Sequence, residues 1–559
     1  MPAYKVLHVG NVAQNAYVNS QLLTRYGVES DVMAYDLYHF ACSPEWYDYT
    51  GTEDFLNNDW FPNFYHLGDR MPRIGPNVAH GPIFQCLTYL TLKNEDADIA
   101  GLALAVVKYL RFKATMFETT TPQGLFYSDD AFHGHLVEFG IKGSALADLL
   151  AGRMYEVTYK QLRQHIAGLC GYVLGETISV PVSNSFLDHC AGLSTEFRDW
   201  LARNRQNRLL EALGLEYRKY DAQIDERHLD AFPQPEITGR VAYLGYWKKL
   251  MQFYDVCIFY GDTPIYAVFT DLENWCAFEH GTIRSIPFED TVHGRLTKYA
   301  YQNAPKVFIT NTDYITAKRR MEFVPEDRVY IPHPFDETRS DAFRETHVPS
   351  APRTQKTFLC PARQDWVAND EKWSKGNDRY FRAAAQLIAE GHEDFVLKCV
   401  RWGTDVEKSD TLIEELGIGR HVEWIKPVSK RKLWELMCDC DCVVDQFLIS
   451  GLGGVGFEAM ALAKPLLTKD DGISNATFFG EAPPVLAADS TETVADQMRR
   501  ILTEPDFTAQ AGQAGLNWVR EYHSAKRIAE LQLKTFADVC DDQGGTISRT
   551  MHAEPRPAP

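Results

Sequence analysis

The chain has 559 residues, too many for one hydrophobic core, which indicates at least two large domains. Its hydrophobic fraction of 45% and charged fraction of 24% are ordinary for a globular protein in water. The net charge of −19 excludes a protein that wraps nucleic acid, although a local basic pocket for one small anion is compatible with it.

The first region, residues 1–335, has the pattern of a Rossmann-like domain. It opens with a buried-type strand, "YKVLHVG", that ends at Gly10, a candidate ligand-binding residue, and a helical pattern and a second strand follow. The alternation is lost over about 40–235, where an aromatic-rich loop and helical patterns predict a helical insertion. Strands return as "YDVCIFYG", "AFEHGT" and "APKVFITN" between residues 254 and 311.

The second half of the chain alternates strands and helices more regularly. Residues 336–355 are polar and predict an interdomain linker, whereas 356–525 predict a second doubly wound parallel sheet. Residues 526–541 predict a C-terminal helix, and 542–559 a disordered tail. The predicted fold class is therefore α/β, with two Rossmann-like domains that face each other across a cleft.

The N-terminus and the cysteines predict a cytoplasmic protein. The sequence enters a strand without a basic and apolar leader, and its apolar runs are shorter than the roughly 20 residues of a spanning helix. Twelve scattered cysteines fit a reducing compartment. Residues 243–255 mix aromatic residues with two lysines, which fits a packed helix or a peripheral contact with the inner face of an anionic membrane.

A short cysteine cluster raises the question of a metal. Cys438, Cys440 and Cys442 would share one face of an extended segment, but no second cluster accompanies them. Structural cysteines are the favoured interpretation over a metal site.

Two cations lie where an open parallel sheet binds ligands, beyond the carboxyl ends of its strands. Arg363 directly follows the strand "TFLCPA", and Lys375 precedes a predicted helix N-terminus. Two cations and a helix N-terminus suit a diphosphate, because free N–H groups and the helix dipole both attract anions. The alternative is a pair of solvated loop residues.

A glycine-rich loop, Gly451–Gly456, follows the later strand "CVVDQF". Its central residues Gly453, Gly454 and Val455 would present backbone N–H groups closely to a phosphate or sugar. Glu458 lies one turn inside the next helix, where a carboxylate suits the vicinal hydroxyls of a ribose. The alternative for Glu458 is a helix-start acid that the dipole stabilises. Together with the two cations, the loop predicts a nucleoside-diphosphate site.

These motifs resemble the donor half of family 4 glycosyltransferases of the GT-B fold. The resemblance rests on "PARQDW", "KGNDRYFRAAAQL" and "DQFLISGLGGVGFEAMALAKPLL" over about 355–525, and it is thinner in the first half. It implies that Arg363 and Lys375 neutralise the donor diphosphate. It also implies that Glu458, as the second Glu of the Glu-x7-Glu motif, binds the ribose. His280 in "FEHG" matches a histidine near the donor sugar, although such a residue also fits an ordinary loop position.

The chain departs from the family at Ser450 and at Ala463, which stands where a glycine is common after the helix. Ser450 stands where the family has the first Glu of its motif, so Asp445 or Gln446 is expected to take over part of the sugar contact. The "DCD" of residues 439–441 is similar to the Asp-x-Asp metal clamp of another glycosyltransferase fold, but its acids alternate with cysteines before a buried strand. We therefore expect neither a metal nor another cofactor.

The resemblance implies a retaining glycosyltransferase. It would move a sugar from a nucleoside-diphosphate sugar to a hydroxyl of a glycan, a lipid-linked intermediate or a protein. No strong nucleophile is evident, which favours attack from the face of the leaving group. The alternatives are a nucleotide-sugar epimerase or a pyridoxal-dependent phosphorylase on the same fold, or a non-catalytic nucleotide-sugar-binding scaffold, which Ser450 would favour.

Overall fold

The computed structural model describes residues 4–35, 42–51, 74–96 and 244–541, with short gaps inside the last two ranges, and single residues between 72 and 107. Most of the predicted helical insertion, with its patterns at 97–112, 143–173 and 193–214, lies outside the described residues, and so does the predicted tail.

Two parallel sheets organise the described part of the chain. The first has the strand order β3-β2-β1-β4-β5-β6-β7, and every strand pair in it is parallel. Its central strands are buried on both faces, as expected for a sheet that helices cover on both sides. The strands are β1 Lys5–Val9, β2 Glu29–Tyr35, β3 Val78–Gly81, β4 Val256–Tyr260, β5 Trp275–Phe278, β6 Lys306–Ile309 and β7 Arg328–Tyr330.

The second sheet repeats this plan in the order β10-β9-β8-β11-β12-β13, again with parallel pairs. In both sheets the chain builds outward on one side of the first strand and then continues on the other side. This confirms the α/β class with two doubly wound, Rossmann-like sheets. The strands are β8 Lys356–Cys360, β9 Phe395–Val400, β10 Val422–Ile425, β11 Cys442–Val444, β12 Leu466–Thr468 and β13 Leu486–Ala487.

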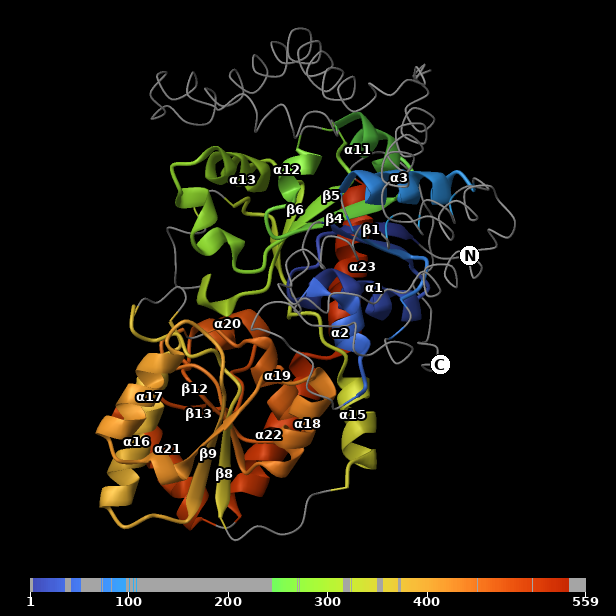
Figure 1. Cartoon of the computed structure of the whole chain (residues 1–559). Helices are drawn as coiled ribbons and strands as arrows, with labels where there is room; N and C mark the ends of the chain where they lie inside the picture. The colour runs from blue at the N-terminus through green and yellow to red at the C-terminus, as the bar shows by residue number, and fades with distance from the viewer. Residues whose placement is uncertain are drawn as a thin grey trace, which may run out of the picture.

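Helices cover both faces of the second sheet, as Figure 1 shows, with α16, α17 and α21 on one side and α18, α19 and α22 on the other. Their bounds are α16 Asn377–Ala389, α17 Val406–Glu415, α18 Lys430–Asp439, α19 Gly454–Ala461, α20 Ser474–Phe479, α21 Thr491–Thr503 and α22 Phe507–Tyr522. The helices of the first half are α1 Asn15–Arg25, α2 Pro44–Asp48, α3 Ile83–Asn94, α11 Leu244–Met251, α12 Pro264–Ala267 and α13 Val292–Gln302.

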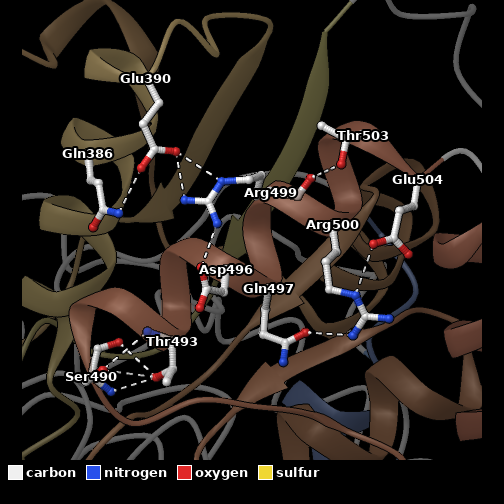
Figure 2. A network of polar contacts seen from close by, with 10 residues as sticks. All are labelled: Gln386, Glu390, Ser490, Thr493, Asp496, Gln497, Arg499, Arg500, Thr503 and Glu504. Atoms are coloured by element: carbon white, nitrogen blue, oxygen red, sulfur yellow. Dashed lines mark hydrogen bonds and ion pairs between the residues drawn. The ribbon is translucent and has the colours of Figure 1, made fainter.

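The outer rim of the second domain carries a network of exposed polar contacts. Figure 2 shows Arg499 of α21 bridging Glu390, at 2.7 Å, and Asp496, at 2.6 Å, beside a capping box of Ser490 and Thr493 at the start of α21. Exposed ion pairs add little to stability, so packing rather than this network fixes α21 against α16.

The last helix, α23 Ala525–Asp541, returns to the first domain and lies beside α1 (Figure 1). Ile528 and Ala529 are fully buried in the core that surrounds β1 and β4. The Gln532 amide donates to Asn19 of α1 at 3.0 Å, and the Phe536 ring lies 5.8 Å from that of Tyr4. α23 therefore completes the first domain.

The segment predicted as an interdomain linker, 336–355, contains a helix, α15 Glu337–Thr346. Arg339 donates to Asp48 of α2 at 3.2 Å and lies over the Tyr47 ring, while Phe343 stacks edge-on against Trp434 of α18. The first part of this segment is thus a helix, α15, that contacts both domains.

One sequence-based expectation needs correction. The range 78–94 falls within the predicted helical insertion, but it holds β3 of the first sheet and the helix α3. The sequence pattern missed β3 because a four-residue strand is too short for a clear alternation. The packed helix that the sequence favoured over 243–255 is present as α11, whose Trp247, Leu250 and Met251 are buried. Among the described residues, no helix combines the length and apolar character needed to cross a bilayer.

Candidate nucleotide-sugar site

Four of the predicted binding residues lie where the second sheet reverses its strand order, between β8 and β11. Arg363 and Lys375 follow β8, and Asp445 and Gln446 follow β11. Neighbouring parallel strands end at the same sheet edge, so these four side chains share one site. The sequence placed them after strands, and the topology shows that those strands are adjacent.

Lys375 is the centre of this group. Its ammonium donates to the side-chain oxygen of Gln446, and its backbone N–H donates to Asp365. Burial lowers the pKa of Lys375, the neighbouring Asp445 raises it, and the positive charges of Arg363 and Arg284 lower it again. Lys375 is therefore a partly desolvated cation among further cations, an environment that an anion would stabilise.

Asp445 faces both Lys375 and the glycine loop. Its side chain is buried, which raises the pKa of the carboxyl, and the nearby Lys375 opposes that rise. A Cβ built on Gly453 would lie 3.6 Å from Oδ2 of Asp445, and one on Gly454 would meet no atom within 4 Å. The loop is thus open at Gly454, while the Asp445 carboxylate lies beneath Gly453.

Both polar atoms of the Gln446 side-chain amide form hydrogen bonds. The oxygen accepts from Lys375, and the nitrogen donates to the carbonyl of Gly451. The amide therefore holds the lysine against the glycine loop, a role that the sequence analysis did not assign to it.

The glycine loop caps α19. Gly453 is the N-cap residue with φ −89° and ψ 173°, and Gly454 and Val455 occupy the first turn. First-turn N–H groups have no partner within their own helix, so this loop offers donors to an anion.

Glu458 lies one turn further along α19 and is buried. One carboxylate oxygen accepts from the Lys430 ammonium and the other from Trp434 Nε1 at 3.1 Å, both in α18. Each carboxylate oxygen has a second lone pair, so these bonds leave acceptor capacity for a ligand hydroxyl. Lys430 and Trp434 were missed by the sequence analysis, because only folding brings α18 beside α19.

His280 follows β5 in the first domain. Burial and the nearby Arg284 lower its pKa to about 4, and its Nδ1 makes no hydrogen bond to the described residues. Its ring stands edge-on to that of His333 at 5.0 Å, and His333 lies 5.9 Å from Phe457 of α19. Ring contacts thus link His280, through His333, to α19 of the second domain.

Gly10 directly follows β1 with φ +86°, and its backbone N–H donates to the carbonyl of Met33 in β2. A Cβ there would lie 3.0 Å from Thr263 Cγ2. These contacts give Gly10 a steric role in the turn. Ser450, the residue that departs from the family motif, lies outside the described residues.

The cysteine cluster is divided between two elements. Cys438 lies in the last turn of α18, Cys440 is its C-cap and Cys442 begins β11, so the three do not form one extended face. Among the residues that the structure describes, no group of three His, Cys, Asp or Glu side chains is arranged to hold a metal ion.

A family comparison matches the part of the chain that contains this site. Residues 367–518 match the family of glycosyl transferases, group 1. The matched segment is about a quarter of the chain and includes Lys375, the glycine loop and Glu458. With the two doubly wound sheets, the match supports a glycosyltransferase of the GT-B fold. A search of curated proteins gives no significant match.

Solved structures show partial similarity at low identity. A mutant of S. aureus TarM, in complex with fondaparinux, alpha-GlcNAc-glycerol and UDP, is 16% identical with a TM-score of 0.39, and covers 52% of this chain and 58% of its own. Sucrose-phosphate synthase from Thermosynechococcus elongatus is 16% identical with a TM-score of 0.41, and covers 57% of this chain and 81% of its own. A UDP-forming trehalose-phosphate synthase from Burkholderia xenovorans is 16% identical with a TM-score of 0.42, and covers 55% of this chain and 80% of its own.

Proposed function

We propose that this protein is a retaining glycosyltransferase that moves a sugar from a nucleoside-diphosphate sugar to a hydroxyl of a glycan, a lipid-linked intermediate or a protein. The observation that carries the proposal is the shared location of Arg363, Lys375 and the open glycine loop at the switch point of the second sheet, inside or beside the matched family segment.

In this proposal the donor diphosphate lies against Arg363, Lys375 and the first turn of α19. The anomeric C–O bond breaks as the diphosphate departs, and fixed cations stabilise the negative charge that develops on the leaving oxygen. Gln446 keeps the Lys375 ammonium in place before the ligand arrives. Catalysis would therefore be electrostatic.

The acceptor hydroxyl would attack from the face that the diphosphate leaves, and its proton would pass to a leaving phosphate oxygen. Glu458 would accept from the donor ribose hydroxyls. Neutral His280 would donate or accept one hydrogen bond at the sugar, because its lowered pKa keeps it uncharged at neutral pH. No metal or other cofactor is part of this scheme.

The first test is binding. Thermal unfolding of the whole chain is measured with UDP-, GDP-, ADP- and dTDP-sugars, because a ligand of the native state raises the apparent stability. We expect one nucleotide class to raise the melting temperature. A chain that none of these donors stabilises would contradict the proposal.

The second test is turnover with the stabilising donor. Arg363→Ala and Lys375→Ala are each expected to lower turnover by about 100-fold, the scale of losing one preorganised charge contact. Arg499→Ala and Lys398→Ala are matched controls, because these residues pair with Glu390 and Glu423 in exposed ion pairs. Full activity of the Arg363→Ala, Lys375→Ala double variant would rule out this diphosphate site.

The same assay separates transfer from its alternatives. Product NMR should show a glycosidic bond with the anomeric configuration of the donor. A new nucleotide sugar formed without any acceptor would instead indicate an epimerase, and donor binding without any product would indicate a scaffold.

A further inference from the structure

A buried polar network lies beside His280 and has no part in the scheme above. Glu279, the residue before it, is fully buried at the end of β5. Its carboxylate accepts from Asn311 Nδ2 at 2.7 Å and from the Tyr314 hydroxyl at 2.8 Å. Burying a carboxylate is costly unless its partners compensate, so this arrangement fixes Asn311 and Tyr314 firmly at the end of β6.

The same two residues hold a guanidinium. Nη2 of Arg284, in the short helix η6 Thr282–Arg284, donates to Asn311 Oδ1 at 2.9 Å, and Cζ lies 5.7 Å from the centre of the Tyr314 ring. Since Glu279 binds the amide nitrogen of Asn311, the amide oxygen is turned toward Arg284. The arginine is half-buried and is oriented before any ligand binds.

This arginine lies where the two domains meet. Its neighbour η8 Thr312–Tyr314 packs against α20 of the second domain, which Figure 1 shows at the junction. His333, in ring contact with His280, also contacts Phe457 of α19. The positive charge of Arg284 lowers the pKa of Lys375 in the second domain as well as those of His280 and His333 in the first.

We propose that Arg284 is a phosphoryl-binding residue that the first domain contributes to the interdomain site, and that Glu279 and Asn311 are its positioning residues. The inference rests on the proposed function. A planar guanidinium gives two parallel bonds to phosphoryl oxygens, and a phosphate between Arg284 and Lys375 would relieve the repulsion between them. Ligand binding would then draw the domains together through opposite charges.

Two sources of this phosphate are compatible with the geometry, the donor diphosphate and a phosphate on the acceptor. Isothermal titration of the full chain with UDP, GDP and ADP tests the first source. Titration of the nucleotide-saturated protein with inorganic phosphate tests the second.

Three variants and one control make the test specific. Arg284→Gln removes the positive charge. Arg284→Lys keeps the charge but loses the planar guanidinium with its two parallel donors. Asn311→Ala removes the amide oxygen that orients the guanidinium. Arg295→Gln is the control, because it removes an arginine of the same domain, on α13, that pairs with Asp290. We expect Arg284→Gln to weaken binding of the stabilising nucleoside diphosphate about tenfold or more, with Arg284→Lys and Asn311→Ala in between.

The salt dependence distinguishes binding from a structural role. Loss of a charge that contacts phosphate reduces the dependence of the dissociation constant on ionic strength, whereas a change in packing leaves that dependence as it is. We expect a shallower dependence for Arg284→Gln and an unchanged one for Asn311→Ala. Melting temperatures of all four variants check that the fold is kept.

The two titrations distinguish the source of the phosphate. Weaker nucleoside-diphosphate binding in Arg284→Gln supports the donor as the source, and loss of inorganic phosphate binding alone supports the acceptor. If Arg284→Gln matches the wild type in both titrations while Lys375→Ala loses nucleotide binding, this inference is overturned and the proposed function stands. A wild-type chain that binds no nucleoside diphosphate overturns both.

Discussion

The Gln446 side chain shows how one residue supports another at the site. Its amide joins the Lys375 ammonium to the Gly451 carbonyl, so it connects the two segments that follow β8 and β11. A lysine with a flexible stem gains most from such a partner, because its rotamer freedom is reduced before the ligand arrives.

We therefore expect Gln446→Ala to weaken nucleoside-diphosphate binding about tenfold, the scale of one hydrogen bond to a charged group. Isothermal titration with the stabilising nucleotide measures this effect. Gln386→Ala, which removes an exposed amide paired with Glu390, is the control. Unchanged affinity in Gln446→Ala would show that the Lys375 ammonium does not need the Gln446 amide to bind the nucleotide.

His523 is a buried histidine that should make the stability of the fold depend on pH. Its ring lies 3.7 Å from that of Phe457, both its nitrogens are buried without a hydrogen-bond partner among the described residues, and burial lowers its pKa to about 3. The unfolded chain binds a proton at this histidine near pH 6.5, and the folded chain does so only near pH 3. The unfolded state thus binds more protons between these values, and stability falls as pH falls.

In His523→Leu, the free energy of unfolding is expected to fall less steeply as the pH is lowered. The difference in slope from wild type should be up to about 1.4 kcal/mol per pH unit between pH 6 and pH 4. Urea unfolding at a series of pH values measures the free energy of unfolding. His392→Leu, at a half-buried histidine shortly after α16, is the control. Parallel pH profiles for wild type and His523→Leu would contradict the assignment.

At the scale of elements, the turn between β1 and α1 depends on one glycine. Gly10 has a backbone conformation that L residues rarely adopt, and a Cβ there would also approach Thr263 Cγ2 at 3.0 Å and the Tyr260 carbonyl at 3.3 Å. Both groups belong to the segment around the end of β4, so the two central strands of the first sheet are close together at this turn.

Gly10→Ala should lower the free energy of unfolding by about 1–2 kcal/mol, from the left-handed conformation and the close contacts. Urea unfolding measures the change. Gly419→Ala serves as the matched control, because a Cβ at Gly419 meets nothing within 4 Å. Equal stability of the two variants would mean that the turn adjusts without cost.

At the scale of the whole molecule, the first domain is completed by α23. This helix follows the second domain in sequence, yet its Phe536 is buried beside Tyr4 and its Gln532 donates to Asn19 of the first domain. The two domains are thus linked twice, through α15 and through the passage from α22 to α23.

Phe536→Ala should therefore destabilise the first domain selectively, by about 3 kcal/mol or more, the cost of a buried aromatic cavity. Hydrogen exchange should accelerate in β1 and β4 and stay unchanged in β8 and β9. Phe288→Ala, at a side chain that is 42% exposed, is the control. Equal acceleration in both sheets would show that the domains unfold as one unit.

The sequence by itself determined the two Rossmann-like domains, because apolar strands and amphipathic helices alternate with periods that the backbone imposes. It also selected Arg363, Lys375, the glycine loop and Glu458, since strand ends and glycine loops are local signals. Strands as short as β3 were missed, because four residues do not establish a period. The tertiary structure alone decided that Gln446 binds Lys375, that Lys430 and Trp434 hold Glu458, and that Glu279 and Asn311 orient Arg284. Each of these contacts joins residues from different elements, and only the packing of those elements brings them within a hydrogen bond of each other.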